Sequence, residues 1–220
     1  MARSYEQACL VARALDVLGE RWTLLIVREL ALGPRRYGDL LEALPGIGTS
    51  LLAARLKHLE RHGVLRRVAL PGPGRAAVYE LSGQDEMPIL AALAEWGARL
   101  GPTPVGHRVR AAWGVVAMRL TALEQAADYD TLTELVVDEE LLWLQGDGEQ
   151  VRVELGRAPV KPALRLTCDT RTFFALARGN VDVDEALASG DLAVVGDPDA
   201  ARLFFRLFRM PGAHPVDTVK

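Results

Sequence analysis

Residues 15–65 have the sequence LDVLGERWTLLIVRELALGPRRYGDLLEALPGIGTSLLAARLKHLERHGVL. Within this stretch, Trp22, Ile26 and Leu30 recur at the spacing that places side chains on one face of a helix. The Gly-Pro pair at 33–34 ends that helix, because proline cannot continue the helical hydrogen bonding. The stretch therefore predicts an amphipathic helix that ends just before residue 33.

Two further helices are predicted in the same stretch. Residues 37–44 indicate a short helix that ends at the Pro-Gly pair 45–46, and Thr49 or Ser50 is expected to cap a longer one. The apolar side chains of the longer helix share the face expected to point inward; they are Leu52, Leu56 and Leu59. The order helix, turn, helix indicates a mainly α domain.

A pair of strands is predicted after the longer helix. Residues 64–70 and 76–81 are rich in strand-forming side chains, and the sequence PGPGR at 71–75 between them favours a tight turn. A strand pair in this position is typical of a β-wing. We therefore expect a winged helix-turn-helix in the first half of the chain.

Short motifs follow one another through this half in a fixed order and spacing. They are LDVLGERWTLLI at 15–26, GPRRY at 33–37, LPGI at 44–47, VYELS at 78–82 and WG at 96–97. In these motifs the chain resembles the HxlR-type bacterial transcription regulators. The resemblance implies duplex DNA as a partner and dimerisation through the terminal helices.

Basic and small side chains mark the surface expected to contact DNA. Residues 28–75 contain nine Lys or Arg against four Asp or Glu, a balance suited to phosphate contact. Small side chains on the outer face of the longer helix permit close approach to base edges, and an arginine at the wing tip suits the minor groove. The candidates are Arg35, Arg36, Thr49, Ser50, Ala53, Ala54, Lys57, Arg61, Arg66, Arg67 and Arg75. A solvated surface that keeps the domain soluble is the alternative for the charges.

Composition and charge indicate a globular protein with two domains. Half of the 220 residues are hydrophobic and a quarter are charged. The formal net charge of −3 divides into +2 for residues 1–102 and −5 for residues 103–220. The Gly-Pro-Thr-Pro segment at 101–104 is typical of a linker. We therefore expect a DNA-binding and dimerisation domain over residues 1–102 and a second domain over residues 103–220.

The second half predicts an α+β domain. Strands are expected over residues 132–137, 141–145, 151–155, 163–168 and 192–195, and helices over residues 172–178, 183–188 and 200–208. The motifs LRL at 164–166, ALASGDL at 186–192 and VGDP at 195–198 resemble the sterol-carrier-protein-like domain. That resemblance implies an apolar cavity for a hydrophobic ligand. Its candidate lining is Phe173, Phe174, Leu176, Leu203, Phe204, Leu207 and Phe208, for which a plain core is the favoured alternative.

The two cysteines and the histidines carry further hypotheses. Cys9 matches the position of a cysteine that some HxlR-type regulators use to sense oxidants, whereas a small buried hydrophobe is the alternative. Cys168 is expected in the core. His58 and His62 have the spacing of two metal ligands, but without a third ligand we expect phosphate contact or solvent exposure.

The function predicted from the sequence is that of a homodimeric, sequence-specific transcription regulator, a repressor, whose DNA occupancy a small hydrophobic effector modulates. Residues 87–100 predict an amphipathic helix with an apolar stripe for a partner helix. The alternative is a lipid-binding or carrier module whose winged helix mediates protein contacts. We expect no enzyme, cofactor or metal, because P-loop, HExxH and GxSxG motifs are absent. We also expect a cytoplasmic protein, without a membrane span or signal peptide.

Overall fold

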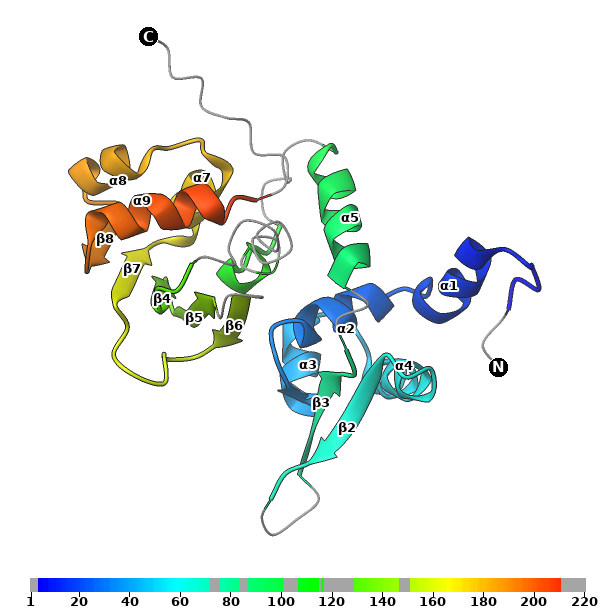
Figure 1. Ribbon diagram of the computed structural model, residues 1–220. Helices are drawn as coiled ribbons and strands as arrows, with labels where there is room; N and C mark the ends of the chain where they lie inside the picture. Colours follow the sequence, from blue (N-terminus) through cyan, green and yellow to red (C-terminus); the bar gives the residue numbers. More distant parts are fainter. Residues whose placement is uncertain are drawn as a thin grey trace. The chain divides into compact units, whose positions relative to one another are not determined.

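The computed structural model describes residues 4–71, 76–83, 87–100, 107–114, 116, 129–146 and 151–210. The chain divides into two compact units, Met1–Leu90 and Ala91–Lys220. The predicted linker at 101–104 lies outside the described residues. The elements of the first part of the chain are α1 (Leu10–Leu18), α2 (Thr23–Leu30), β1 (Arg35–Arg36), α3 (Tyr37–Ala43), α4 (Thr49–Arg61), β2 (Leu65–Ala69), β3 (Ala77–Leu81) and α5 (Met87–Ala98); all except β1 are labelled in Figure 1.

The first unit is a winged helix-turn-helix, as predicted. α3 and α4 form the helix-turn-helix, and the antiparallel sheet with strand order β1-β3-β2 forms the wing and its base. The core consists of apolar side chains from every helix of the motif and from the first wing strand; it includes Ile26, Leu30, Leu40, Leu44, Leu52, Leu56, Leu59 and Leu65. Each fully buried side chain of this size contributes about 1.5–3 kcal/mol to folding. The predicted inward stripe of the longer helix is therefore confirmed.

The start of α4 differs from the prediction. Gly48, rather than Thr49 or Ser50, is the N-cap residue, with φ −78° and ψ 152° and without a side-chain cap. Ile47 before the cap and Leu52 in the first turn are both buried, which are the positions of a hydrophobic staple. Burial of these two side chains thus determines where the helix begins. The hydroxyl groups of Thr49 and Ser50, which were predicted to cap it, remain at the surface.

A strained residue separates α1 from α2. Trp22, the N-cap of α2, has φ 78°, a left-handed conformation that costs a non-glycine residue roughly 1–2 kcal/mol. Its ring lies against Gly46, where a Cβ atom would stand 3.7 Å from the indole, and the Arg21 guanidinium lies 5.3 Å from the ring centroid. The contacts of the indole with Gly46 and with the Arg21 guanidinium offset the backbone strain.

The second unit is α+β, which confirms the predicted class. Its sheet has the strand order β6-β5-β4-β7-β8, in which only the β4–β7 pair is parallel. α9 packs against β7 and β8, and α8 packs against β8 and α9. The elements are β4 (Thr133–Val137), β5 (Glu140–Gly146), β6 (Val151–Leu155), β7 (Leu164–Cys168), α7 (Thr170–Arg178), α8 (Val183–Ser189), β8 (Leu192–Val195) and α9 (Pro198–Leu207).

Most of the aromatic side chains proposed as cavity lining form the core instead. Phe173, Phe204 and Phe208 are at most 1% exposed. The Phe204 and Phe208 rings lie 4.9 Å apart, and the ring of Tyr129 lies 5.2 Å from that of Phe208. These rings close the space between α9 and the sheet.

Gly114 provides a test of the packing in the second unit. A Cβ atom at this position would lie 2.8 Å from Cε1 of Phe173, which is fully buried. We therefore expect Gly114→Ala to destabilise the unit by about 1–3 kcal/mol, the usual cost of overpacking. Thermal unfolding measures the change. Gly97→Ala is the control, since nothing lies within 4 Å of a Cβ atom there; equal melting of the two variants would contradict the packing argument.

Candidate nucleic-acid interface

The outer face of α4 carries six of the predicted DNA-contacting residues. All six are exposed, whereas the leucines on the opposite side of the helix are buried; they are Thr49, Ser50, Ala53, Ala54, Lys57 and Arg61. The N-terminal part of this face has only small side chains, and the two cations follow one and two turns later. A helix with this distribution can approach base edges closely at one end and reach phosphates at the other.

Polar side chains fasten α4 to the connection between α1 and α2. The Arg55 guanidinium donates to Oε2 of Glu20 at 2.7 Å and to the carbonyl oxygen of Arg21 at 3.4 Å. On the next turn, Nε2 of His58 lies 3.1 Å from the carbonyl oxygen of Val17 at the end of α1. These contacts hold the orientation of α4, and neither Arg55 nor Glu20 was a predicted site residue. Their partners lie more than 30 positions apart in the sequence, so no local pattern indicates the pairing.

His58 corrects a prediction. It was expected at a phosphate or in solvent, but it is only 6% exposed, and the centroid of its ring lies 4.6 Å from that of His62, with the two rings tilted by 51°. Burial, reinforced by the neighbouring His62, holds the pKa of His58 below its ordinary value, although the contact with Val17 opposes this shift. The ring is therefore neutral at pH 7, with Nε2–H donating to Val17 and Nδ1 facing Arg61.

The wing arginines occupy different environments. Arg66 donates to Oε1 of Glu80 on the neighbouring strand at 2.6 Å, whereas Arg67 is exposed and makes no ion pair with any described carboxylate. Arg75, predicted at the tip, lies outside the described residues. Within the wing, Arg67 is thus the exposed cation best available for a phosphate.

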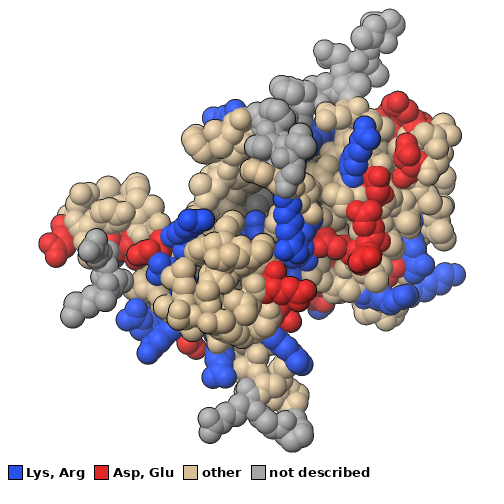
Figure 2. All heavy atoms as spheres, turned by 180° about the vertical axis from the view of Figure 1, so that it is seen from behind, with Lys and Arg blue, Asp and Glu red and all other residues tan. Residues whose placement is uncertain are grey.

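The two arginines of β1 also differ. Arg36 is exposed, and its backbone N–H donates to Oδ2 of Asp39 at 2.9 Å, which begins α3. Arg35 is half-buried, and its Nε and Nη2 atoms are shielded from solvent. In the space-filling view, Lys and Arg side chains gather around the part of the first unit that carries the wing (Figure 2). The exposed cations and the outer face of α4 together form the candidate interface.

The two cysteines differ sharply in environment. Cys9 is exposed at the N-cap of α1, where the backbone N–H groups of Ala12 and Val11 lower the pKa of its thiol. The Arg13 N–H donates to the Cys9 carbonyl at 3.0 Å, which places Arg13 one turn away. Cys168 is buried in β7, and burial raises the pKa of its thiol to about 12.

The described residues contain neither a metal-binding cluster nor a membrane-spanning helix. Within the described ranges, no group of three or more His, Cys, Asp or Glu side chains is arranged to hold a metal ion. No helix in the described part of the chain has the length and apolar character needed to cross a bilayer.

A helix-turn-helix with an exposed, cation-bearing second helix and a two-stranded wing defines a DNA-binding transcriptional regulator of the winged-helix class. The model of the HxlR-like helix-turn-helix family matches residues 17–103, and that of the SCP-2 sterol transfer family matches residues 110–209. The chain belongs to the HxlR-like helix-turn-helix family, and both resemblances predicted from the sequence are confirmed.

Two curated relatives agree with this assignment in sequence, and one solved structure is similar to part of the chain. The HTH-type transcriptional regulator sll1512 of Synechocystis sp. is 38% identical over 92 residues, which are 41% of this chain and 68% of that protein. The HTH-type transcriptional regulator Mb3122 of Mycobacterium bovis is 38% identical over 102 residues, 46% of this chain and 64% of that protein. The reduced form of the regulator YodB from B. subtilis is 30% identical, with 42% of this chain and 94% of that chain covered and a TM-score of 0.38. The chain thus spans about two thirds of the two curated relatives.

The buried histidine predicts a pH dependence of stability. Because the pKa of His58 is lowered in the folded state, the unfolded chain binds a proton more readily, and the contribution of His58 to stability is lost as pH falls below about 6.5. We expect the unfolding temperature to fall further between pH 7.5 and pH 5.5 in the wild type than in His58→Gln. His62→Gln, which changes the exposed neighbour, should retain most of the wild-type pH dependence. An identical pH dependence in wild type and His58→Gln would rule out this role.

The two thiols predict a single reactive cysteine. A thiolate is the nucleophile, so the lowered pKa of the Cys9 thiol moves its reactivity to a lower pH than that of an ordinary cysteine. Cys168 should react only after unfolding, because it is buried and its pKa is about 12. Labelling with a thiol reagent across pH, followed by mass spectrometry of the peptides, measures both. Rapid labelling of Cys168 in the native protein would contradict the assignment, and Cys9→Ser is the control.

Proposed function

We propose that this chain is a homodimeric repressor that reads a specific DNA sequence through the outer face of α4 and grips the backbone with the wing. The observation that carries the proposal is the division of α4 into a buried leucine stripe and an exposed face of small and basic residues. A helix of this kind enters the major groove with its N-terminal residues toward the bases. A dimer bound across a promoter would then exclude the transcription machinery.

The proposed roles follow from the environment of each residue. Thr49, Ser50, Ala53 and Ala54 approach base edges, because they are small and lie at the start of α4. The proposed phosphate and minor-groove contacts come from Arg35, Arg36, Lys57, Arg61, Arg66, Arg67 and Arg75. Among these, Arg36, Lys57, Arg61 and Arg67 are the strongest candidates, since all four are exposed. Arg66 first has to leave Glu80, and Arg35 is partly shielded from solvent.

Apolar side chains left at the surface support the dimer. On α1, Leu10 and Val11 are 79% and 67% exposed, and on α5, Trp96 is 59% exposed. An exposed apolar stripe along a helix favours burial against a second helix. A two-fold dimer would place its two α4 helices on half-sites about 34 Å apart, or a multiple of that distance. The domain organisation that we propose is DNA binding and dimerisation over residues 1–102 and ligand binding over residues 103–220.

Two kinds of signal are proposed to change DNA occupancy. A hydrophobic effector in the second unit would act only if it binds one arrangement of the dimer better than the other, because equal affinity shifts no equilibrium. Oxidation or alkylation of Cys9 would act through α1, which the cysteine begins. We also propose a cytoplasmic location, where the thiols stay reduced and DNA is accessible.

The proposal is tested by DNA binding. Fluorescence anisotropy on a duplex from upstream of the protein's own gene, beside a scrambled duplex and across a salt series, should show tighter binding to the native sequence and affinity that falls as salt rises. No binding of either duplex at low salt would instead favour the alternative, a lipid carrier whose winged helix contacts proteins.

One cation on α4 provides the sharper test. Lys57→Gln should weaken binding several-fold and reduce the slope of log affinity against log salt by about 1, since one phosphate contact is lost. Lys161→Gln is the matched control, because Lys161 is an exposed lysine of the second unit. Unchanged affinity and slope in Lys57→Gln would show that this face of α4 does not lie on DNA.

A further inference from the structure

The connection between α1 and α2, residues 19–22, also borders α4. Nε of Arg55 on α4 donates to the carbonyl oxygen of Arg21 at 3.4 Å. The indole of Trp22 lies against Gly46, where a Cβ atom would stand 3.7 Å from the ring, and Gly46 comes shortly before Thr49, the first residue of α4. The connection therefore runs beside the N-terminal half of α4, the half that carries the small exposed side chains.

Arg21 is an exposed cation of this connection. Its guanidinium lies over the Trp22 ring, 5.3 Å from the centroid. Stacking of this kind uses the flat face of the guanidinium and leaves its in-plane N–H groups available to an oxygen acceptor. A side chain already held against a ring also loses less rotamer entropy when it binds. Arg21 is therefore presented to solvent in a partly ordered state that suits an anion.

The neighbouring carboxylate does not neutralise Arg21. Glu20 is bound by Nη2 of Arg55 at 2.7 Å, and the side chain of Arg55 is only 19% exposed. No other carboxylate in the described ranges forms an ion pair with Arg21. The charges of Glu20, Arg21 and Arg55 therefore leave one positive charge in excess, and it is carried at the surface by Arg21.

The position beside α4 indicates which anion the guanidinium meets. A helix that enters the major groove has a phosphate backbone along each flank, and contacts from neighbouring elements to those phosphates fix its register on the duplex. The phosphate contacts proposed above come from β1, α4 and the wing. The connection adds an exposed, unneutralised cation on the flank of α4 that carries Arg55.

We propose that Arg21 binds a backbone phosphate of duplex DNA, and that Trp22 is the positioning residue that holds its guanidinium beside α4. The connection between α1 and α2 is then a further DNA-contacting element of the first unit. The inference rests on the proposed function and deepens it, because it adds a contact that no site residue inferred from the sequence provides. A phosphate contact does not distinguish bases, so it strengthens binding to any duplex equally.

A salt series with Arg21→Gln tests the contact, by fluorescence anisotropy on the native-sequence and scrambled duplexes. The slope of log affinity against log salt should fall by about 1, and the affinities for both duplexes should fall by the same factor. Arg21→Lys keeps the charge and should keep the wild-type slope. Thermal unfolding verifies that both variants are folded. An unchanged slope in Arg21→Gln, or a slope in Arg21→Lys reduced as far as in Arg21→Gln, would overturn the proposal.

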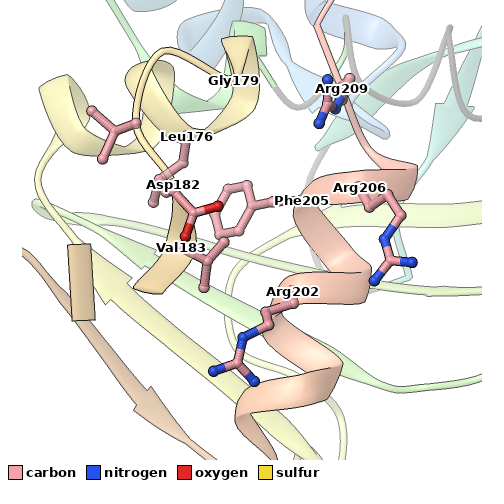
Figure 3. A pocket seen from close by; sticks show the side chains of 9 residues that line it. Leu176, Gly179, Asp182, Val183, Arg202, Phe205, Arg206 and Arg209 are labelled. Atoms are coloured by element: carbon pink, nitrogen blue, oxygen red, sulfur yellow. The ribbon is translucent and has the colours of Figure 1, made fainter. Parts of the chain in front are cut away.

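Arg206→Gln is the matched control. Arg206 is an exposed arginine of α9 in the second unit, and it lines a cavity of about 350 Å³ among α7, α8 and α9 whose apolar lining includes Leu176 (Figure 3). No carboxylate in the described part of the chain forms an ion pair with it. Both substitutions change the net charge of the chain by the same amount, so Arg206→Gln reports the effect of net charge alone. An equal loss of slope in the two variants would overturn the assignment to Arg21.

The positioning role of Trp22 is tested by a double-mutant cycle. Trp22→Leu removes the ring that holds the guanidinium, so it should weaken DNA binding in the wild-type background and have no further effect in the Arg21→Gln background. Trp22→Phe, which keeps an aromatic ring, is the milder variant and should retain more of the affinity than Trp22→Leu. Equal weakening by Trp22→Leu in both backgrounds would show that Trp22 does not act through Arg21.

Comparison with Lys57→Gln separates this inference from the proposed function. If Lys57→Gln lowers the slope and Arg21→Gln does not, α4 contacts DNA as proposed and the contact at Arg21 is wrong. If Arg21→Gln alone lowers the slope, the contact at Arg21 stands and the proposed phosphate contact of α4 fails. If both contacts form, the double variant should lower the slope by about 2, since two phosphate contacts are lost.

Discussion

Burial of the leucine stripe of α4 governs the first unit. Leu52, Leu56 and Leu59 are at most 1% exposed, and together they contribute roughly 5–9 kcal/mol of apolar burial, an upper estimate. That energy fixes the rotation of α4 about its own axis. The residues on the opposite side of α4 are consequently exposed. Their side chains do not contribute to the core, so small and basic residues can occupy these positions.

Much of the fold was predictable from local patterns. The alternation at residues 151–155 predicted β6 with the bounds that the structure has, because a strand buried on one face alternates. The short apolar run at residues 192–195 likewise predicted β8 with the observed bounds. The cap of α4 was not predictable in the same way. Both hydroxyl residues there satisfy the usual capping preference, and the burial of Ile47 and Leu52 determined the start of the helix instead.

In the candidate sites, too, some features follow from local sequence patterns and others depend on contacts between distant segments. The outer face of α4 follows from helical periodicity, since it is the complement of the leucine stripe. The burial of His58 and the pairing of Arg55 with Glu20 depend on contacts with a segment far along the chain. The cavity of the second unit could not be predicted from the sequence either. Among the described residues, Leu176 is the one proposed lining residue that does line the cavity. Most of the proposed phenylalanines are instead buried in the core.

The side chains that fasten α4 to the end of α1 have a mechanical consequence. Arg55 and His58 bind backbone and carboxylate oxygens between Val17 and Arg21, so α1 cannot rotate or translate without breaking these contacts or carrying α4 with it. Covalent chemistry at Cys9, or a partner helix docked on α1, would therefore be passed on through these contacts to α4, the helix proposed to contact DNA. A shift of α1 would be transmitted as a tilt of α4, and the spacing of two such helices in a dimer would change by twice the displacement of one.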